Sequence, residues 1–268
     1  MTRPGPRLVI LAACAAGVIS ACGRHEPASE SALALGASSA HAATLLNDDG
    51  EPQAVVVAGI RGPDPDLAPD AAETSRSALN ALISNTQLST LQIGAPDRYE
   101  RIPVQITLAD QSDVAEQMIR SGHALVWPRE GQEVDFDRLI GLERIAREQG
   151  TGHWAGGVFV IRDSDPNRLA PFLDSAQIIE GRVIATGENR EGRLYLNFGL
   201  DWRTDLTISA SPEVRARFEA QGLHLESLEG AVIRARGWLY AENGPMIALT
   251  HRAQLEIIDA PSARAIPR

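Results

Sequence analysis

The chain has 268 residues, of which 44% are hydrophobic and 22% charged, as expected for a globular protein with one large domain or two small ones. Its formal net charge is −10 at pH 7, and every basic residue other than histidine is an arginine. An acidic protein binds phosphate backbones poorly without a specific site. The charge therefore argues against a protein that coats nucleic acid, although a local basic cleft remains compatible with it.

The first 22 residues have the pattern of an export signal. Arg3 and Arg7 precede an apolar stretch at 8–18, which is too short to cross a bilayer as a helix, since a span needs about 20 residues. The four residues that follow end at Cys22 and resemble a bacterial lipoprotein box, in which two small residues precede a cysteine that receives a lipid. This resemblance implies that Cys22 is the lipidation site and that residues 1–22 are the signal peptide.

The composition after Cys22 predicts a tether. Cys14 is the only other cysteine and lies inside the signal, so no disulfide is expected in the mature chain. Residues 23–42 are rich in Ala, Ser, Glu and Pro without a period, which is typical of a flexible linker. We expect a lipid-anchored envelope protein that faces the periplasm from the outer membrane. A cut after Ala42, giving a soluble exported protein, is the alternative.

A first domain is expected at 43–155, followed by a linker at 156–176. Strands are predicted at 44–46, 55–60, 87–93, 102–108 and 124–127. Helices are predicted at 71–83, 113–121 and 136–149. The order of elements is that of a mainly β, α+β domain.

Three phrases in this domain resemble the staphylococcal nuclease-like (thermonuclease) family. The charged turn from Asp97 to Arg101 precedes a strand, and Ile119–Val126 matches the phrase that ends the family's next helix. Glu143, Ala146 and Arg147 then precede Gly152-His153-Trp154, which is similar to the family's closing Gly-x-Trp. The resemblance implies an OB-type barrel of five strands with three helices.

The family's chemistry requires groups that this chain lacks in part. The resemblance implies two carboxylates that hold Ca²⁺, a glutamate that activates water, and two arginines that neutralise phosphoryl charge. At the matching positions Ala43 and Arg61 replace the carboxylates, and Val56 replaces the first arginine. Asp64 stands where the glutamate is expected, and Arg101 is the retained arginine. We therefore expect a degenerate site without a metal, with Arg101 and Asp64 as its remnant.

Structural roles for these residues remain open alternatives. Arg101 can pair with Asp64 or Asp97 at the barrel mouth, and Arg61 can pair with Asp64 in place of the lost metal. Asp48 and Asp49 could act as substitute ligands from a neighbouring turn. His123 and His153 show no metal-ligand spacing, and Trp127 and Trp154 are expected in the core or capping it.

A second domain is expected at 177–260, before a tail at 261–268. Strands are predicted at 177–186, 193–198, 205–210, 230–240 and 246–258, with a helix at 212–221 before the last two. Three strands, a helix and two strands is the order of an OB fold, so a second OB-like barrel is predicted. Its phrases resemble the C-terminal extension of some exported nuclease-like proteins.

Aromatic and basic residues of the second domain suggest a binding face. OB folds bind oligonucleotides or oligosaccharides by stacking on aromatic rings beside a basic groove. The candidate residues are Arg193, Tyr195, Arg203, Trp238 and Tyr240. Arg234 and Arg236 share the side of Trp238, which predicts either a wet, arginine-lined groove or a rim where aromatic rings pack on arginine stems.

These observations favour a non-catalytic binding or scaffold protein of the cell envelope, with a protein or glycan partner and no cofactor. An exported metal-dependent nuclease acting on DNA or RNA, with Ca²⁺ at a rearranged site, is the alternative. Binding of cell-wall glycan by the second domain is a third possibility, which rests on fold analogy alone.

Overall fold

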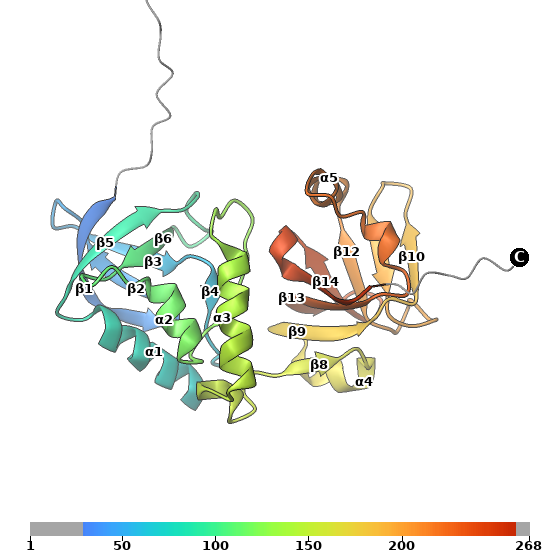
Figure 1. Cartoon of the computed structure of the whole chain (residues 1–268), viewed down its shortest axis with the longest axis horizontal. Helices are drawn as coiled ribbons and strands as arrows, with labels where there is room; N and C mark the ends of the chain where they lie inside the picture. Colours follow the sequence, from blue (N-terminus) through green and yellow to red (C-terminus); the bar gives the residue numbers. More distant parts are fainter. Residues whose placement is uncertain (1–28, 261–268) are drawn as a thin grey trace, which may run out of the picture.

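The computed structural model describes residues 29–260 as two neighbouring β structures, with α3 of the first beside β9 and β13 of the second (Figure 1). The signal peptide, Cys22 and the tail at 261–268 lie outside the described residues. Within the described residues, no helix combines the length and apolarity needed to cross a membrane.

The N-terminal structure, which we call the barrel domain (residues 30–155), is a closed barrel of five strands in the order β1-β2-β3-β6-β5. These strands are β1 (Glu30–Ser39), β2 (Ala42–Leu46), β3 (Pro52–Val57), β5 (Gln87–Gln92) and β6 (Ile102–Thr107). All pairs are antiparallel except β3 and β6, which run parallel. A five-stranded barrel is confirmed, but the strand predicted at 124–127 lies outside it, because Leu125 and Val126 pair with Arg61 and Ile60 in a separate ladder and Glu30–Ser39 supplies the fifth barrel strand.

Three helices pack on this barrel, as predicted. They are α1 (Pro69–Ile83), α2 (Val114–Arg120) and α3 (Phe136–Glu148). Asp113 and Asp135 cap α2 and α3, because each side chain accepts a hydrogen bond from a backbone N–H in the first turn. A short ladder of β4 (Ile60–Arg61) and β7 (Leu125–Val126) and the 3₁₀ helix η1 (Gly152–Trp154) complete the domain. Leu79, Ile106 and Met118 lie at the centre of its core, fully buried.

Strand β1 corrects the expected tether at 23–42. It pairs with β2 on one side and with β5 on the other, and so closes the barrel. Its Ala and Ser content suggested a linker, yet Ala32 and Ala37 are buried in the core, where a small side chain is sufficient. Asn80 of α1 also accepts a hydrogen bond from the Ala37 N–H at 3.0 Å. The barrel therefore begins at Glu30, not at residue 43.

The second structure, the C-terminal domain (residues 161–259), contains one strongly curled sheet in the order β10-β11-β12-β14-β13-β9-β8, with β15 also paired to β13. Its strands are β8 (Ile161–Asp163), β9 (Ser175–Arg182), β10 (Ala185–Glu188), β11 (Leu194–Asn197), β12 (Thr207–Ala210), β13 (Val232–Ala241), β14 (Pro245–Leu249) and β15 (Leu255–Asp259). Its helices are α4 (Pro166–Leu169), η2 (Ala170–Phe172), α5 (Pro212–Ala220), η3 (Leu225–Leu228) and η4 (Arg252–Gln254).

The path of residues 175–188 explains the curl. Its first half, β9, pairs with β13, and its second half, β10, pairs with β11 on the far side of the sheet. Strands β12 and β14 run parallel, as β3 and β6 do in the barrel domain. This arrangement is consistent with the predicted OB-like order, in which the first strand pairs with both the second and the fourth.

Two boundaries differ from the predictions. The expected linker at 156–176 contains β8, which pairs in parallel with β9 and belongs to the second sheet. The predicted strand at 246–258 is divided into β14 and β15 by η4. Local apolar pattern cannot show a break of this kind, because η4 is fixed by the Gln254 side chain, which accepts hydrogen bonds from the backbone N–H groups of Thr250 and His251.

A buried ion pair joins the two domains. Arg236 of β13 is 1% exposed, and its Nη1 lies 2.9 Å from Glu143 Oε1 of α3. The same Nη1 donates to the Val126 carbonyl at 3.1 Å, and Nη2 donates to Glu256 at 2.7 Å. A small apolar cluster of Leu125, Phe159 and Ile178 lies at the same junction. Arg236 therefore lies in a dry interface rather than in a wet groove.

Candidate functional site

A cleft of about 1120 Å³ opens between the two domains. The barrel domain contributes most of its walls, with residues 38–41, 61–66, 97–99, 101 and 127–130 and one face of α1. The C-terminal domain contributes Trp238, Ala248, Thr250 and Gln254. The cleft thus brings together Asp64, Arg101 and Trp238, three of the residues singled out in the sequence.

Arg61 lies where the barrel domain meets Trp238. Its guanidinium carbon is 5.5 Å from the ring centre of Trp127 and 5.2 Å from that of Trp238, so it contacts one aromatic ring from each domain. Asp64 Oδ2 is 3.8 Å from its Nη2, which confirms the expected Arg61–Asp64 pair as a loose contact. Its Nε is buried without a hydrogen-bond partner among residues 29–260. Burial, followed by the charge of Arg129, lowers the pKa of Arg61.

Arg101 is fixed by Asp97, one of the two acidic partners expected for it. Its Nε and Nη2 donate to Asp97 Oδ2 at 2.9 and 2.7 Å, while Asp97 Oδ1 accepts from the backbone N–H groups of Tyr99 and Arg101. Although burial opposes the shift, these hydrogen bonds hold the pKa of Asp97 below its usual value. The pair stays charged, and Arg101 keeps one guanidinium edge committed to Asp97.

Arg129 and His41 add polar groups to the cleft that no sequence motif had indicated. The Arg129 side chain is half-buried, and no ion pair or hydrogen bond to it occurs among the described residues. Burial, then the nearby Arg101, lowers its pKa. His41 Nδ1 accepts a hydrogen bond from the Gly62 N–H at 3.4 Å, so its Nε2 carries the proton of the neutral ring.

The charges around His41 show how close the arginines lie. Burial, with the charges of Arg61, Arg129 and Arg101 in decreasing order, lowers the pKa of His41 to about 3. Two outer acids of the cleft have partners, because Glu73 pairs with Arg76 and Glu130 with Arg217, each at 2.6 Å. Five arginines and five acids line the cleft as a whole, and three of these arginines are grouped around His41.

The comparison with known families agrees with this geometry. Residues 55–156 match the family model described as staphylococcal nuclease homologue. These residues form a staphylococcal nuclease-like domain. The match runs from β3 to just beyond η1 and includes Arg61, Asp64 and Arg101, whereas β1 and β2 precede it. No curated protein gives a significant match to the chain.

The nuclease-like domain does not fit the Ca²⁺ ion of its family. Ca²⁺ requires six to eight oxygen ligands, commonly from carboxylates. Ala43 is 1% exposed in the barrel core and offers no ligand, and Arg61 places a guanidinium where the second carboxylate is expected. Asp48 and Asp49 lie exposed on the β2–β3 turn and do not line the cleft. We derive no step through a metal ion.

The histidines and tryptophans of the nuclease-like domain have structural contacts. His153 Nε2 lies 2.8 Å from Ser75 Oγ and 3.5 Å from His123 Nδ1. Trp127 is buried, and Trp154 packs against the apolar cluster at the domain junction. The expectation of core or capping tryptophans is confirmed.

The five candidate residues of the C-terminal domain are divided between separate places. Tyr195 lies in a smaller pocket on the sheet, while Trp238 lines the cleft. Arg193 and Tyr240 each contact Ser209, on the sheet between these two sites. Arg203 stacks on Trp202 at 4.5 Å and pairs with Asp201 on an exposed loop.

The predicted arginine-lined groove beside Trp238 does not form. Arg236 is buried against Glu143, and Arg234 pairs with Glu180 at 2.6 Å and with Glu256 at 3.8 Å. Alternation along β13 placed these arginines on one face correctly. It could not show that α3 and neighbouring carboxylates cover that face.

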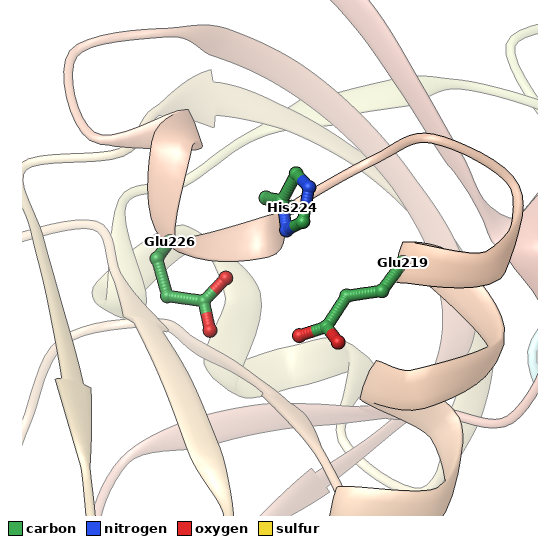
Figure 2. A group of neighbouring side chains, drawn as sticks. All are labelled: Glu219, His224 and Glu226. Atoms are coloured by element: carbon green, nitrogen blue, oxygen red, sulfur yellow. The ribbon is translucent and has the colours of Figure 1, made fainter.

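One group outside the cleft has metal-ligand composition. Figure 2 shows Glu219, at the end of α5, with His224 and Glu226, whose ligand atoms lie within 4.8 Å of one another. Arg215 contacts both carboxylates and also Glu188, so a cation of the protein already lies at the centre of the group, shared among three carboxylates. We interpret the group as an arginine-centred ion-pair cluster.

Proposed function

We propose that the protein is a non-catalytic binding protein whose interdomain cleft holds an anionic group of its ligand. One observation carries the proposal: the Arg61 guanidinium lies where the nuclease family places a cation ligand, in contact with Trp127 and Trp238. Exchanging a carboxylate for an arginine reverses the charge that the site selects. Arg129, unpaired among the described residues, and the Nε2–H of His41 add donors that favour an oxyanion.

The proposed setting is the cell envelope. The export signal and the lipidation candidate Cys22 support a protein anchored in the outer membrane and facing the periplasm. The proposed partner is a protein or glycan with an exposed carboxylate or phosphate. The participation of both domains in the cleft supports a binding role, because a ligand there contacts Trp238 as well as the nuclease-like domain.

Calorimetry tests the reversed charge directly. The chain is expressed from a start before Glu30, because a later start deletes the strand that closes the barrel. We expect no heat of Ca²⁺ binding, and saturable binding of inorganic phosphate that is weakened at least about tenfold in Arg129→Gln. The matched control is Arg144→Gln, an exposed arginine of α3 outside the cleft. Calcium binding, or equal phosphate binding by the two variants, would contradict the proposal.

A metal-dependent nuclease is the second candidate, because Asp64 and Arg101 line the same cleft. It requires cleavage of single-stranded DNA or RNA that is abolished by EDTA and lost in Arg101→Ala. The non-catalytic proposal expects no cleavage above that of the Arg101→Ala protein, with or without Ca²⁺. Persistent EDTA-sensitive cleavage by the purified wild-type chain would establish the nuclease instead.

A further inference from the structure

The outer face of the C-terminal sheet has a buried floor. Ile208 and Ala210 of β12 belong to the domain core, so Thr207 and Ser209, which alternate with them along the strand, face outward. Even so, Thr207 is 3% exposed and Ser209 is fully buried, and the outward-facing Met246 of β14 is 5% exposed. Outward residues of a sheet are buried only when other parts of the molecule rise above them. This face is therefore recessed rather than flat.

The recess contains a pocket of about 400 Å³, within the usual range of about 300–1,000 Å³ for small-molecule sites. Thr207 and Met246 form its floor, since they are cross-strand neighbours on β12 and β14. Tyr195 of β11, Trp202 of the following loop and the β13–β14 turn form its walls. We call it the aromatic pocket. It lies apart from the interdomain cleft, with which it shares no lining residue.

Two aromatic rings give the aromatic pocket an apolar surface. Tyr195 is half-buried, and Trp202 is 50% exposed, which leaves ring surface open to a ligand. Arg203 stacks on Trp202 but does not line the pocket, so Trp202 has contacts on both sides. Ring faces of this kind bind the apolar C–H surface of a flat ligand while their polar atoms stay available for hydrogen bonds.

Several polar groups in the aromatic pocket are not fully used. Asn197 Oδ1 accepts from Thr207 Oγ1 at 3.3 Å, while no partner of its amide nitrogen occurs among residues 29–260. Tyr195 Oη accepts from Asn189 Nδ2 at 3.4 Å, which leaves its own O–H free to donate. The side chains of Glu242 and Asn243 have no hydrogen bond or ion pair to the described residues. Donors and acceptors thus surround the rings.

The charge of the aromatic pocket restricts the ligand further. Two carboxylates line it, Glu188 and Glu242, and no arginine or histidine does among the described residues. Arg215 pairs with Glu188 from outside the pocket but is shared with Glu219 and Glu226, and Glu242 has no ion pair to the described residues, so the lining is net negative. A ligand with a phosphate or carboxylate would meet this charge directly, whereas Arg193 lies close to Tyr240 and does not line the pocket. Nucleic acid and acidic sugars are therefore disfavoured here.

We propose that the aromatic pocket binds a carbohydrate ring that carries no acidic group. Such a ring offers an apolar face to Tyr195 or Trp202, and vicinal hydroxyl groups that both donate to Glu242 and accept from Asn197 and Asn243. This site is independent of the proposed anion site, since it disfavours anionic ligands and uses other residues. Of the five candidate residues listed for the second domain, Tyr195 lines this pocket, and Arg193, Arg203, Trp238 and Tyr240 do not.

The test is calorimetric titration of the full chain with tri-N-acetylchitotriose, maltotriose and trigalacturonate. We expect at least one neutral trisaccharide to bind with a Kd below about 10 mM, and trigalacturonate to bind at least about tenfold more weakly. Trp202→Ala should weaken the neutral sugar at least about tenfold. Ile257→Ala removes an apolar side chain of similar exposure from β15, a strand that lines neither pocket, and should change the Kd less than about twofold.

A second variant distinguishes loss of binding from unfolding. Circular dichroism checks that both variants are folded. Glu242→Ala lies on an exposed turn and should also weaken the neutral sugar, without changing the melting temperature. Absence of binding by both neutral trisaccharides, tighter binding of trigalacturonate, or an unchanged Kd in folded Trp202→Ala and Glu242→Ala would each overturn the proposal. None of these results depends on Arg61 or Arg129, so the anion site is judged separately.

Discussion

Removing the Arg236 guanidinium should destabilise the whole molecule more than any exposed arginine does. In Arg236→Met, Glu143 keeps only the hydrogen bond from the Val126 N–H, at 2.6 Å, while its side chain remains almost completely buried. Breaking a buried ion pair by deleting one partner typically costs about 3–5 kcal/mol, because the remaining charge is desolvated and uncompensated. Methionine retains most of the aliphatic volume, so the loss reports the charge rather than a cavity.

For a chain of this size the loss corresponds to a fall in melting temperature of about 6–20 °C. Urea denaturation followed by circular dichroism measures the free energy of unfolding directly. Arg234→Met is the matched control, because Arg234 lies on the same strand and its partners Glu180 and Glu256 are partly hydrated, at 34% and 24% exposure. We expect it to cost less than about 1 kcal/mol.

A double variant separates charge from packing. Glu143→Gln keeps an acceptor for the Val126 N–H and removes the carboxylate charge, so Arg236→Met with Glu143→Gln should be more stable than Arg236→Met alone. If Arg236→Met lies within about 1 kcal/mol of the wild type, the pair does not join the domains energetically. If the double variant is no more stable than the single one, the uncompensated carboxylate is not the cause of the loss.

Further predictions concern His41, the two glycines Gly122 and Gly141, and Asp135 at the start of α3. His41 has a folded-state pKa of about 3, below its unfolded value of about 6.5. The stability that its neutral ring contributes is therefore present above pH 6.5 and is lost toward pH 3, by up to about 1.4 kcal/mol per pH unit. In urea titrations His41→Gln should lose less stability than the wild type between pH 6.5 and 4.5, and parallel curves for the two proteins would contradict this. Gly122→Ala should cost at least about 2 kcal/mol, since φ is +68° and the new Cβ would lie 2.1 Å from the Thr151 oxygen. Gly141→Ala, in open space on α3, should instead stabilise by about 0.5–1 kcal/mol, and the two melting temperatures should move in opposite directions. Asp135→Ala should cost about 1 kcal/mol through loss of the α3 cap, and unchanged thermal unfolding would refute that role.

The sequence predicted local order better than long-range contacts. Helices α1, α2 and α3 were predicted within a few residues, because apolar spacing and capping side chains are local signals. Strand β1 was missed, because its buried residues are alanines that do not stand out from an Ala-rich linker. Its role depends on pairing with β5, about 50 residues later, which no local pattern encodes.

The candidate site shows the same division. Matching to family phrases selected Arg61, Asp64 and Arg101, which all line the cleft. The contribution of Trp238 could not be foreseen, because it depends on how the two domains meet. Arg236 was placed on the correct face of β13, but its partner Glu143 is 93 residues away in the chain. Periodicity assigns a side chain to a face, whereas the element that covers this face is determined by tertiary packing.

Strand β1 also sets how far the molecule could stand from a membrane. A linker from Cys22 to residue 42 would be about 70 Å long at full extension, at about 3.5 Å per residue. With Glu30 already in the barrel, the chain from Cys22 to Glu30 spans eight residue steps and reaches about 28 Å at most. A lipid on Cys22 would therefore hold the barrel within roughly its own width of the bilayer surface. Ligands of the cleft would then be captured beside the membrane rather than deep in the periplasm.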